Sequence, residues 1–201
     1  MADVKPYPIT VTGELSDPPG QWQWLFKWLL AIPHYIILAF LSIAAFFATV
    51  YAFFAILFTG KYPRGVFDFN VGVMRWSWRV GFYSYQALGT DKYPPFSLDK
   101  GGYPADLDVE YPEKLSQGLV LVKWWLLAIP HYIIVAIFQG GRNTVGLTFI
   151  LSIVCGFIVL FTGKYPEDLF KFIVGMNRWV YRVYAYAALM RDEYPPFRFE
   201  P

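Results

Sequence analysis

The sequence predicts an all-α integral membrane protein in which one unit occurs twice in tandem, each unit with an apolar helical segment and an amphipathic helix. Composition points to a membrane, because 56% of the 201 residues are hydrophobic and only 16% are charged. Aromatic residues make up 21%, and amphipathic rings are stable at a membrane–water boundary. The tandem organisation follows from a ten-residue segment at 28–37 that recurs unchanged at 125–134.

Two further blocks support the duplication. Phe-Thr-Gly-Lys-Tyr-Pro at 58–63 returns at 161–166, and Tyr-Pro-Pro-Phe at 93–96 returns at 194–197. We therefore expect a first membrane repeat in residues 1–100 and a second in 101–201. The second copy holds six extra residues between the first two blocks, near 139–144, which predicts a loop there.

Each copy opens with a short segment in which apolar and polar residues alternate. These segments are Ile9–Thr12 and Leu107–Glu110, and similar alternation occurs at 96–98 and 197–199. Such alternation is typical of half-buried strands. The four segments could form a small cytoplasmic β-layer.

A long apolar stretch follows, from Trp22 to Phe58 and from Gly118 to Phe161. Residues 35–58 carry no charge, and about 20 apolar residues suffice to cross a bilayer. One interpretation is a single span that is kinked at Pro33. We favour a helical hairpin in each repeat, with helices at 22–41 and 42–58 and at 118–138 and 145–161, because the inserted Gly-Gly cannot lie in lipid as open backbone.

The hairpin interpretation predicts a multi-pass topology. Identical motifs should meet identical surroundings, so we expect the two copies to lie parallel, with the Thr-Gly-Lys-Tyr-Pro turns at 59–63 and 162–166 on one face. In that arrangement every lysine and arginine except Arg142 lies on this face. An excess of basic residues marks the cytoplasmic side, which also places both termini in the cytoplasm.

An amphipathic helix is predicted after each turn, at 66–88 and 169–190. Arg75 and Arg79 share one helical face, as do Arg178 and Arg182 in the second copy. Such a helix could lie in the interface with its arginines toward water or lipid phosphate. It could instead span the membrane with the arginines toward the bundle interior. We favour the interfacial position.

The blocks at 29–34, 58–65 and 91–96 give the chain a family resemblance. The chain resembles a bacterial integral membrane family of unknown function, the domain of unknown function 4389 family, in two tandem copies. The resemblance implies a bacterial inner (cytoplasmic) membrane location and assigns no activity or catalytic residue. The second copy departs from the pattern at Glu167-Asp168, where the first has Arg64-Gly65.

The arginines are the best candidates for function. Guanidinium groups match phosphate oxygens, so Arg75, Arg79, Arg178 and Arg182 could bind lipid headgroups or an acidic protein partner. The alternative is a solvated face or internal pairing with Asp68 and Asp168.

His34 and His131 occupy matching positions just after a proline. Two imidazoles could in principle ligate one haem axially. The more ordinary interpretation is that each histidine caps carbonyls freed by the proline or lies at the interface, so we expect no cofactor.

Composition and motifs exclude several classes of function. The net charge of +2 provides no field for nucleic acid. Phosphate loops, metal-ligand clusters and nucleophile–base pairs are missing from the sequence, so we expect no enzyme. The leading hypothesis is a non-catalytic accessory or scaffold subunit of a larger membrane complex, or a lipid-organising protein. The expected partners are membrane lipids and either a protein of a membrane complex or a second copy of this chain. The alternatives are a small transporter or channel at the repeat interface and a bis-histidine haem carrier.

Overall fold

A computed structural model describes residues 7–15, 19–141 and 143–200. The first repeat contains strand β1 (Ile9–Gly13), a 3-10 turn η1 (Gln23–Phe26), and helices α1 (Lys27–Thr59) and α2 (Arg64–Tyr83). The second contains strand β2 (Ala105–Val109), helix α3 (Leu119–Val122), a π-helical turn η2 (Lys123–Leu127) and helix α4 (Ile129–Gln139). A small hairpin of β3 (Gly140–Gly141) and β4 (Thr144–Val145) leads to α5 (Leu147–Thr162) and α6 (Glu167–Ala187).

Helix α1 is a single helix of 33 residues, so the hairpin predicted for the first copy is wrong. Serine costs little in a helix interior, and residues 41 and 42 offer neither the glycine nor the proline that a turn needs. The helix ends at the turn that the sequence predicts at 59–63. Gly60 takes the left-handed conformation at φ 68° and donates its N–H to Ile56, and Gly163 does the same after α5.

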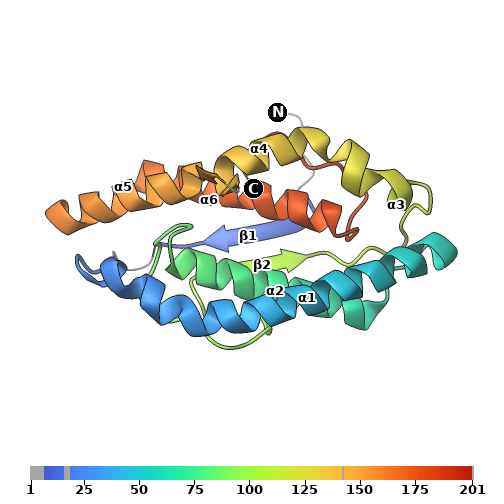
Figure 1. The fold of residues 1–201 in the computed structure, drawn as a ribbon, viewed down its shortest axis with the longest axis horizontal. Coiled ribbons are helices and arrows are strands. Elements are labelled where there is room, and N and C mark those ends of the chain that lie inside the picture. Colours follow the sequence, from blue (N-terminus) through green and yellow to red (C-terminus); the bar gives the residue numbers. More distant parts are fainter. Residues whose placement is uncertain (1–6, 16–18, 142, 201) are drawn as a thin grey trace.

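The apolar stretch of the second copy is broken, but it does not form a hairpin of helices either. The insertion predicted near 139–144 contains the short paired strands β3 and β4, and α5 then continues in the direction of α4 along the long axis (Figure 1). Thr148 donates its hydroxyl to the carbonyl of Phe138 across the break at 2.7 Å, which satisfies a helix-end acceptor.

The π-helical turn η2 absorbs an extra tryptophan. Lys27 stands seven residues before His34, whereas Lys123 stands eight residues before His131, because Trp124 and Trp125 replace a single tryptophan. The Ala128 N–H bonds to the Lys123 carbonyl five residues back, at 3.1 Å. One residue is thus added without rotating the helix beyond it.

A pseudo-two-fold axis relates the repeats. Strand β1 pairs antiparallel with β2, and Val11 lies opposite Leu107. Helix α1 runs along one side of the molecule and α3–α5 run along the other in the opposite direction (Figure 1). The two copies therefore run antiparallel along the long axis and not parallel as expected. The turns at 59–63 and 162–166 lie at opposite ends of that axis.

The amphipathic helices form the centre of the molecule, and both were predicted to within a few residues. Helix α2 packs on α1 and on β2, while α6 packs on α4, α5 and β1. One core joins both repeats and includes Trp78, Phe82 and Ile173. The strand predictions at 9–12 and 107–110 are confirmed in outline, whereas 96–98 and 197–199 form no strand.

The described residues include one helix that is long and apolar enough to cross a membrane, at Gln23–Thr59. A second candidate span results only if two helical segments, Leu119–Leu127 and Ile129–Gln139, count as one span although the chain bends by 46° between them. The multi-pass topology is therefore not supported. Residues 1–6 and 201, and with them the predicted position of the termini, lie outside the described residues.

Candidate functional site

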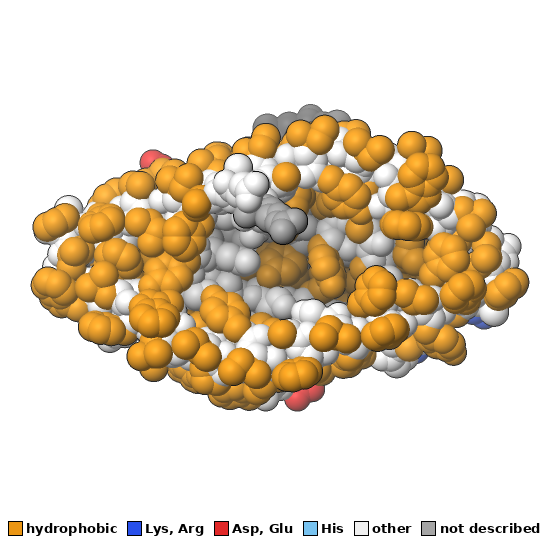
Figure 2. Space-filling view, viewed as in Figure 1, with side chains coloured by type: hydrophobic (Ala, Val, Ile, Leu, Met, Phe, Trp, Pro, Cys, Tyr) orange, Lys and Arg blue, Asp and Glu red, His pale blue; other side chains and the backbone are white. Residues whose placement is uncertain are grey.

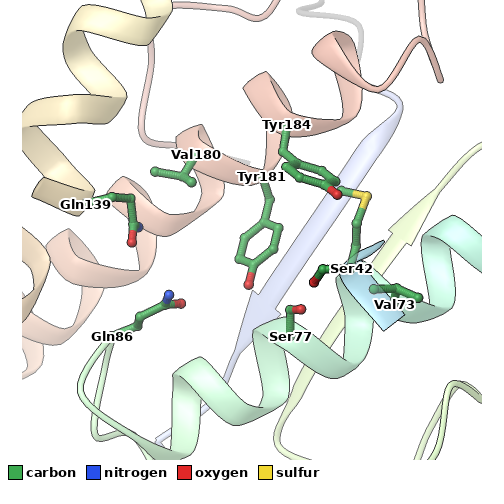
Figure 3. A pocket seen from close by; sticks show the side chains of 9 residues that line it. Ser42, Val73, Ser77, Gln86, Gln139, Val180, Tyr181 and Tyr184 are labelled. Atoms are coloured by element: carbon green, nitrogen blue, oxygen red, sulfur yellow. The ribbon is translucent and has the colours of Figure 1, made fainter. Parts of the chain in front are cut away.

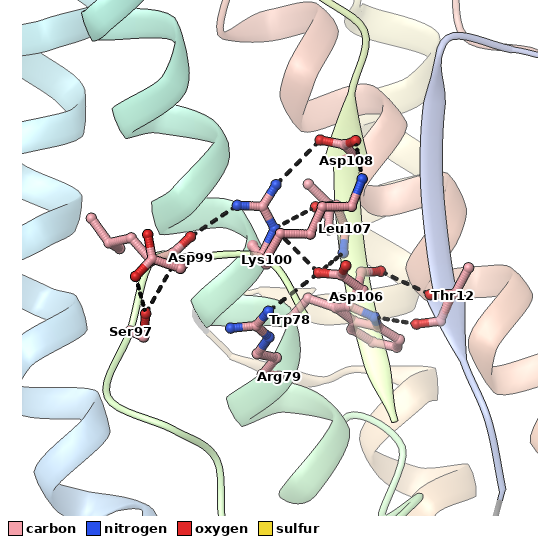
Figure 4. A network of polar contacts seen from close by, with 11 residues as sticks. Thr12, Trp78, Arg79, Ser97, Asp99, Lys100, Asp106, Leu107 and Asp108 are labelled. Carbon is pink, nitrogen blue, oxygen red and sulfur yellow. Dashed lines mark hydrogen bonds and ion pairs between the residues drawn. The ribbon is translucent and has the colours of Figure 1, made fainter. Parts of the chain in front are cut away.

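The arginines of the first repeat bind the strand that opens the second repeat. Arg75 donates to the carbonyls of Leu107 and Leu98 at 2.8 Å each and pairs with Asp106 and Asp108 at 3.2 Å (Figure 4). Arg79 also pairs with Asp106, at 3.3 Å. Charge-assisted bonds of this kind fix α2 against β2.

The second repeat repeats this geometry, and among the described residues the acceptors of its arginines are backbone carbonyls. Arg178 donates to the carbonyls of Val11 at 3.2 Å and Phe199 at 2.6 Å. Arg182 donates to the carbonyls of Arg198 and Glu200. Strand β1 carries Thr10 and Thr12, which lie opposite Asp108 and Asp106 in the register. Carboxylates on both strands would face one another and repel, which explains why only β2 carries them.

Burial places these arginines inside the protein. Arg79 is 1% exposed and Arg182 is fully buried, Arg75 is also buried, and Arg178 is half-buried. Burial lowers the pKa of Arg79, and Asp106 opposes this shift. Burial lowers the pKa of Arg182 to about 10, and the charges of Arg178 and Arg198 add to this effect.

The structure thus favours internal pairing over contact with lipid headgroups. The partners differ from those expected, because the carboxylates come from Asp106 and Asp108 of β2. Asp68 pairs with the exposed Arg64 at 3.3 Å, and Asp168 is exposed. The arginines of each amphipathic helix thus face a strand and a tail of the protein itself.

His34 and His131 lie in separate aromatic cages and are not brought together. The Nδ1 atom of His34 accepts the indole N–H of Trp76 at 3.0 Å, and the ring stacks on Phe96 at 4.0 Å. His131 has the same environment in its own repeat, with Trp179 and Phe197. The carbonyl near each proline is capped by a tyrosine instead of by the histidine, since Tyr93 donates to the carbonyl of Leu30 at 3.0 Å.

A buried lysine–aspartate pair in each repeat was missed by the sequence reasoning. Lys27 pairs with Asp91 at 2.8 Å, and Lys123 pairs with Asp192 at 2.7 Å. Both lysine side chains are 1% exposed or less. A lysine precedes the repeated ten-residue segment in both copies, and this recurrence could have revealed the pairs. The extra tryptophan of the second copy, however, shifts the alignment of the two lysines by one residue.

The outer surface of α1 and of α3–α5 is apolar. Figure 2 shows hydrophobic side chains over most of this face outside its centre, and the acidic and basic groups of the described residues that are seen in it lie at the edges. The exposed side chains are large and come from both repeats: Phe40, Phe46, Phe47, Phe54, Phe58, Ile133, Ile137, Phe149, Phe157 and Phe161. An apolar surface of this extent marks a membrane or protein interface.

A hollow interrupts this face near its middle (Figure 2). It has a volume of about 230 Å³ and is lined by residues of α1, α2, α4, α6 and the segment after α2. Its lining includes the polar side chains of Ser42, Ser77, Gln86, Gln139, Tyr181 and Tyr184, beside the apolar side chains of Val73, Met74 and Val180. They extend toward a shared space from both repeats (Figure 3). No sequence signal indicated this site, because these residue types do not recur between the copies.

No group of three or more His, Cys, Asp or Glu side chains that could hold a metal ion occurs in the part of the chain that the structure describes. A family model, Domain of unknown function (DUF4389), matches residues 21–97 and again residues 119–198. The chain belongs to the DUF4389 family. The two DUF4389 matches contain the lysine–aspartate pairs, the histidine cages and the four arginines, whereas β1 and β2 lie outside them. No curated protein and no solved structure matches the chain.

Proposed function

We propose that this chain is a non-catalytic membrane protein that rests in the bilayer on its apolar face and organises the lipid or the membrane complex beside it. The observation that carries this proposal is the apolar face of α1 and α3–α5. Burying apolar surface contributes roughly 25 cal/mol per Å², so a face of this extent favours an apolar environment strongly. Membrane lipid and the apolar surface of a larger membrane complex are the two environments that would cover this face.

The geometry favours a helix layer that lies along the membrane over one that stands across it. Helix α1 is about 50 Å long, from 33 residues at 1.5 Å each, whereas the hydrocarbon core is about 30 Å thick. The ion pair of Lys100 and Asp108 is 61% and 46% exposed and lies beside β2, at mid-length of the molecule. An upright molecule would place this exposed pair in hydrocarbon, which is costly.

The internal roles of the charged groups support a non-catalytic role. The arginines and the buried lysines hold the strands and tails against the helices, so they are committed to structure. A transport path lined by arginine finds no support in this arrangement, because Arg75 and Arg178 face the strands. A haem bridged by His34 and His131 finds none either, because each imidazole is enclosed in its own repeat.

Flotation with lipid vesicles tests the proposal. The purified protein should rise with vesicles through a density gradient and should remain bound at high salt, because the contact is apolar. Phe40→Glu/Phe47→Glu should leave much of the protein at the bottom, since each substitution puts a charge into the face. The matched control, Phe40→Leu/Phe47→Leu, keeps the face apolar and should float like the wild type.

A glutamate variant that floats as well as the leucine variant would overturn the proposal, as would release of the wild type by salt alone. Purification from a native membrane in mild detergent would then separate the two forms of the proposal. A stoichiometric protein partner supports the accessory-subunit form, and lipid alone supports the lipid-organising form.

A further inference from the structure

Helix α1 touches the rest of the protein along a narrow stripe. Its buried residues lie on one side of the helix: Lys27, Ala31, His34, Leu38, Ala45, Ala52 and Ile56. Only 17% of its most apolar stretch is buried, and no Asp, Glu, Lys or Arg occurs from Trp28 to Gly60. Lipid covers the exposed apolar side chains of such a helix only when most of its diameter, about 10 Å, lies below the headgroups.

The second layer of helices limits how deep this insertion goes. Helix α2 packs on α1, and α6 packs on α4 and α5. At the start of α2, the side chains of Arg64 and Asp68 are 65% and 57% exposed. At the start of α6, those of Lys171 and Glu167 are 71% and 78% exposed. Placing such charges in hydrocarbon is costly, so the hydrocarbon ends between the two layers and holds only α1 and α3–α5.

A layer that is one helix thick occupies a single leaflet. The hydrocarbon core is about 30 Å thick, so each leaflet supplies about 15 Å, which exceeds the helix diameter of about 10 Å. Helix α1 is about 50 Å long and therefore adds an area on the order of 500 Å² to that leaflet and none to the other. Area added to one leaflet fits best where that leaflet is already the larger one, on the convex side of a curved membrane.

We propose that this chain recognises convex membrane curvature, and that its single-leaflet helix layer binds strongly curved lipid surfaces in preference to flat ones. The inference rests on the proposed seating of the apolar face in lipid. Curvature opens gaps between the lipids of the convex leaflet, and the large exposed rings of Phe40, Phe47 and Phe58 are suited to fill such gaps. The feature recognised is thus the shape of the lipid surface.

Flotation with vesicles of two sizes tests the inference. Phosphatidylcholine vesicles of about 30 nm and about 200 nm in diameter are supplied with equal outer-leaflet area, and roughly five-fold more protein should float with the small ones. Phe40→Leu/Phe47→Leu keeps the layer apolar and should keep the preference, whereas Phe40→Glu/Phe47→Glu should weaken binding to both sizes. A soluble protein tethered by a His tag to nickel-chelating lipid gives the ratio for binding without insertion.

Three exposed positions on α1 measure how the layer lies. Ile36, Phe47 and Phe58 follow one another at intervals of eleven residues, about three helical turns, so they share one face of α1. Each is replaced by cysteine in the Cys155→Ser background and carries a nitroxide spin label. All three labels should lie at the same depth, in the hydrocarbon of one leaflet. An upright helix would place Ile36 and Phe58, about 33 Å apart, at opposite membrane surfaces.

The outcomes separate this inference from the proposed function. Protein that floats equally with both vesicle sizes, relative to the tethered protein, contradicts curvature recognition and leaves the membrane seating intact. Unequal label depths along α1 contradict the single-leaflet layer and with it the inference. Failure to float with either size contradicts both. A preference for small vesicles together with equal label depths supports the inference.

Discussion

Val11 of β1 lies opposite Leu107 of β2, and each carbonyl accepts the Nε–H of an arginine from the other repeat. Arg75 of the first repeat reaches Leu107, and Arg178 of the second reaches Val11. The repeats are therefore exchanged at their opening strands, and neither can complete its polar contacts without the other. We expect the chain to unfold as one cooperative unit and not as two independent halves.

Asp106→Asn should destabilise the protein by about 2 kcal/mol. Asp106 pairs with both Arg75 and Arg79, and removing its charge leaves the buried Arg79 without the carboxylate it pairs with and Arg75 with Asp108 alone. Denaturant unfolding in detergent measures the change. The control Asp68→Asn removes an exposed pair with Arg64 and should cost less than about 0.5 kcal/mol. Equal effects of the two substitutions would contradict the exchange of strands.

Asp91→Asn should cost about 3 kcal/mol, because it leaves the buried ammonium of Lys27 without its carboxylate. The double variant Lys27→Met/Asp91→Asn removes both charges and should recover more than half of that loss. Unfolding of the single and double variants gives the coupling between the two sites. Asp99→Asn, at an exposed aspartate, serves as the control. Additive losses in the double variant would show that the pair has no structural role.

Deleting Trp125 should leave the protein folded, with a stability within about 1 kcal/mol of the wild type. The deletion gives Lys123 and His131 the same spacing as Lys27 and His34, so the π-helical turn can become α-helical. Deleting Ile134 instead removes a residue that no π-turn compensates and rotates the helix beyond it by about 100°. That variant should lose most of its stability. Near-ultraviolet circular dichroism and thermal unfolding distinguish the two outcomes.

Several features could be predicted from the sequence because each is supported by the same pattern in both copies. The duplicated blocks locate the helix stops at Gly60 and Gly163, the amphipathic helices and the break near Gly140. The short alternation of apolar and polar residues at 9–12 and 107–110 indicates the strands, since successive side chains of a pleated strand point to opposite faces of the sheet.

The relation between the copies could not be predicted from the blocks. The repeated blocks are the same whether two equal units pack in parallel or about a two-fold axis, and the argument from identical surroundings holds in either case. The arginine partners were wrong for a related reason. Asp68 and Asp168 are near in sequence, whereas Asp106 and Asp108 become neighbours only when the opening strands are exchanged. The central hollow depends on residues that are not repeated, so the duplication could not indicate it.

The two Thr-Gly-Lys-Tyr-Pro turns should lie on the same side of the membrane although they lie at opposite ends of the molecule. The pseudo-two-fold axis runs along the view of Figures 1 and 2, and the apolar face is seen along that same direction. When this face rests in a bilayer, the axis is perpendicular to the membrane, and a rotation about it leaves depth unchanged. The turns at 59–63 and 162–166 are therefore at equal depth.

Cysteine labelling tests this orientation. Cys155→Ser removes the buried native thiol, and Lys61→Cys and Lys164→Cys then place single thiols in the two turns, where both lysines are exposed. A membrane-impermeant maleimide should label both positions in inside-out vesicles and neither in right-side-out vesicles, if the basic turns face the cytoplasm. Labelling of the two positions from opposite sides would require the axis to lie in the membrane plane. The apolar helices would then cross the bilayer, and the seating of the apolar face along one leaflet would be wrong.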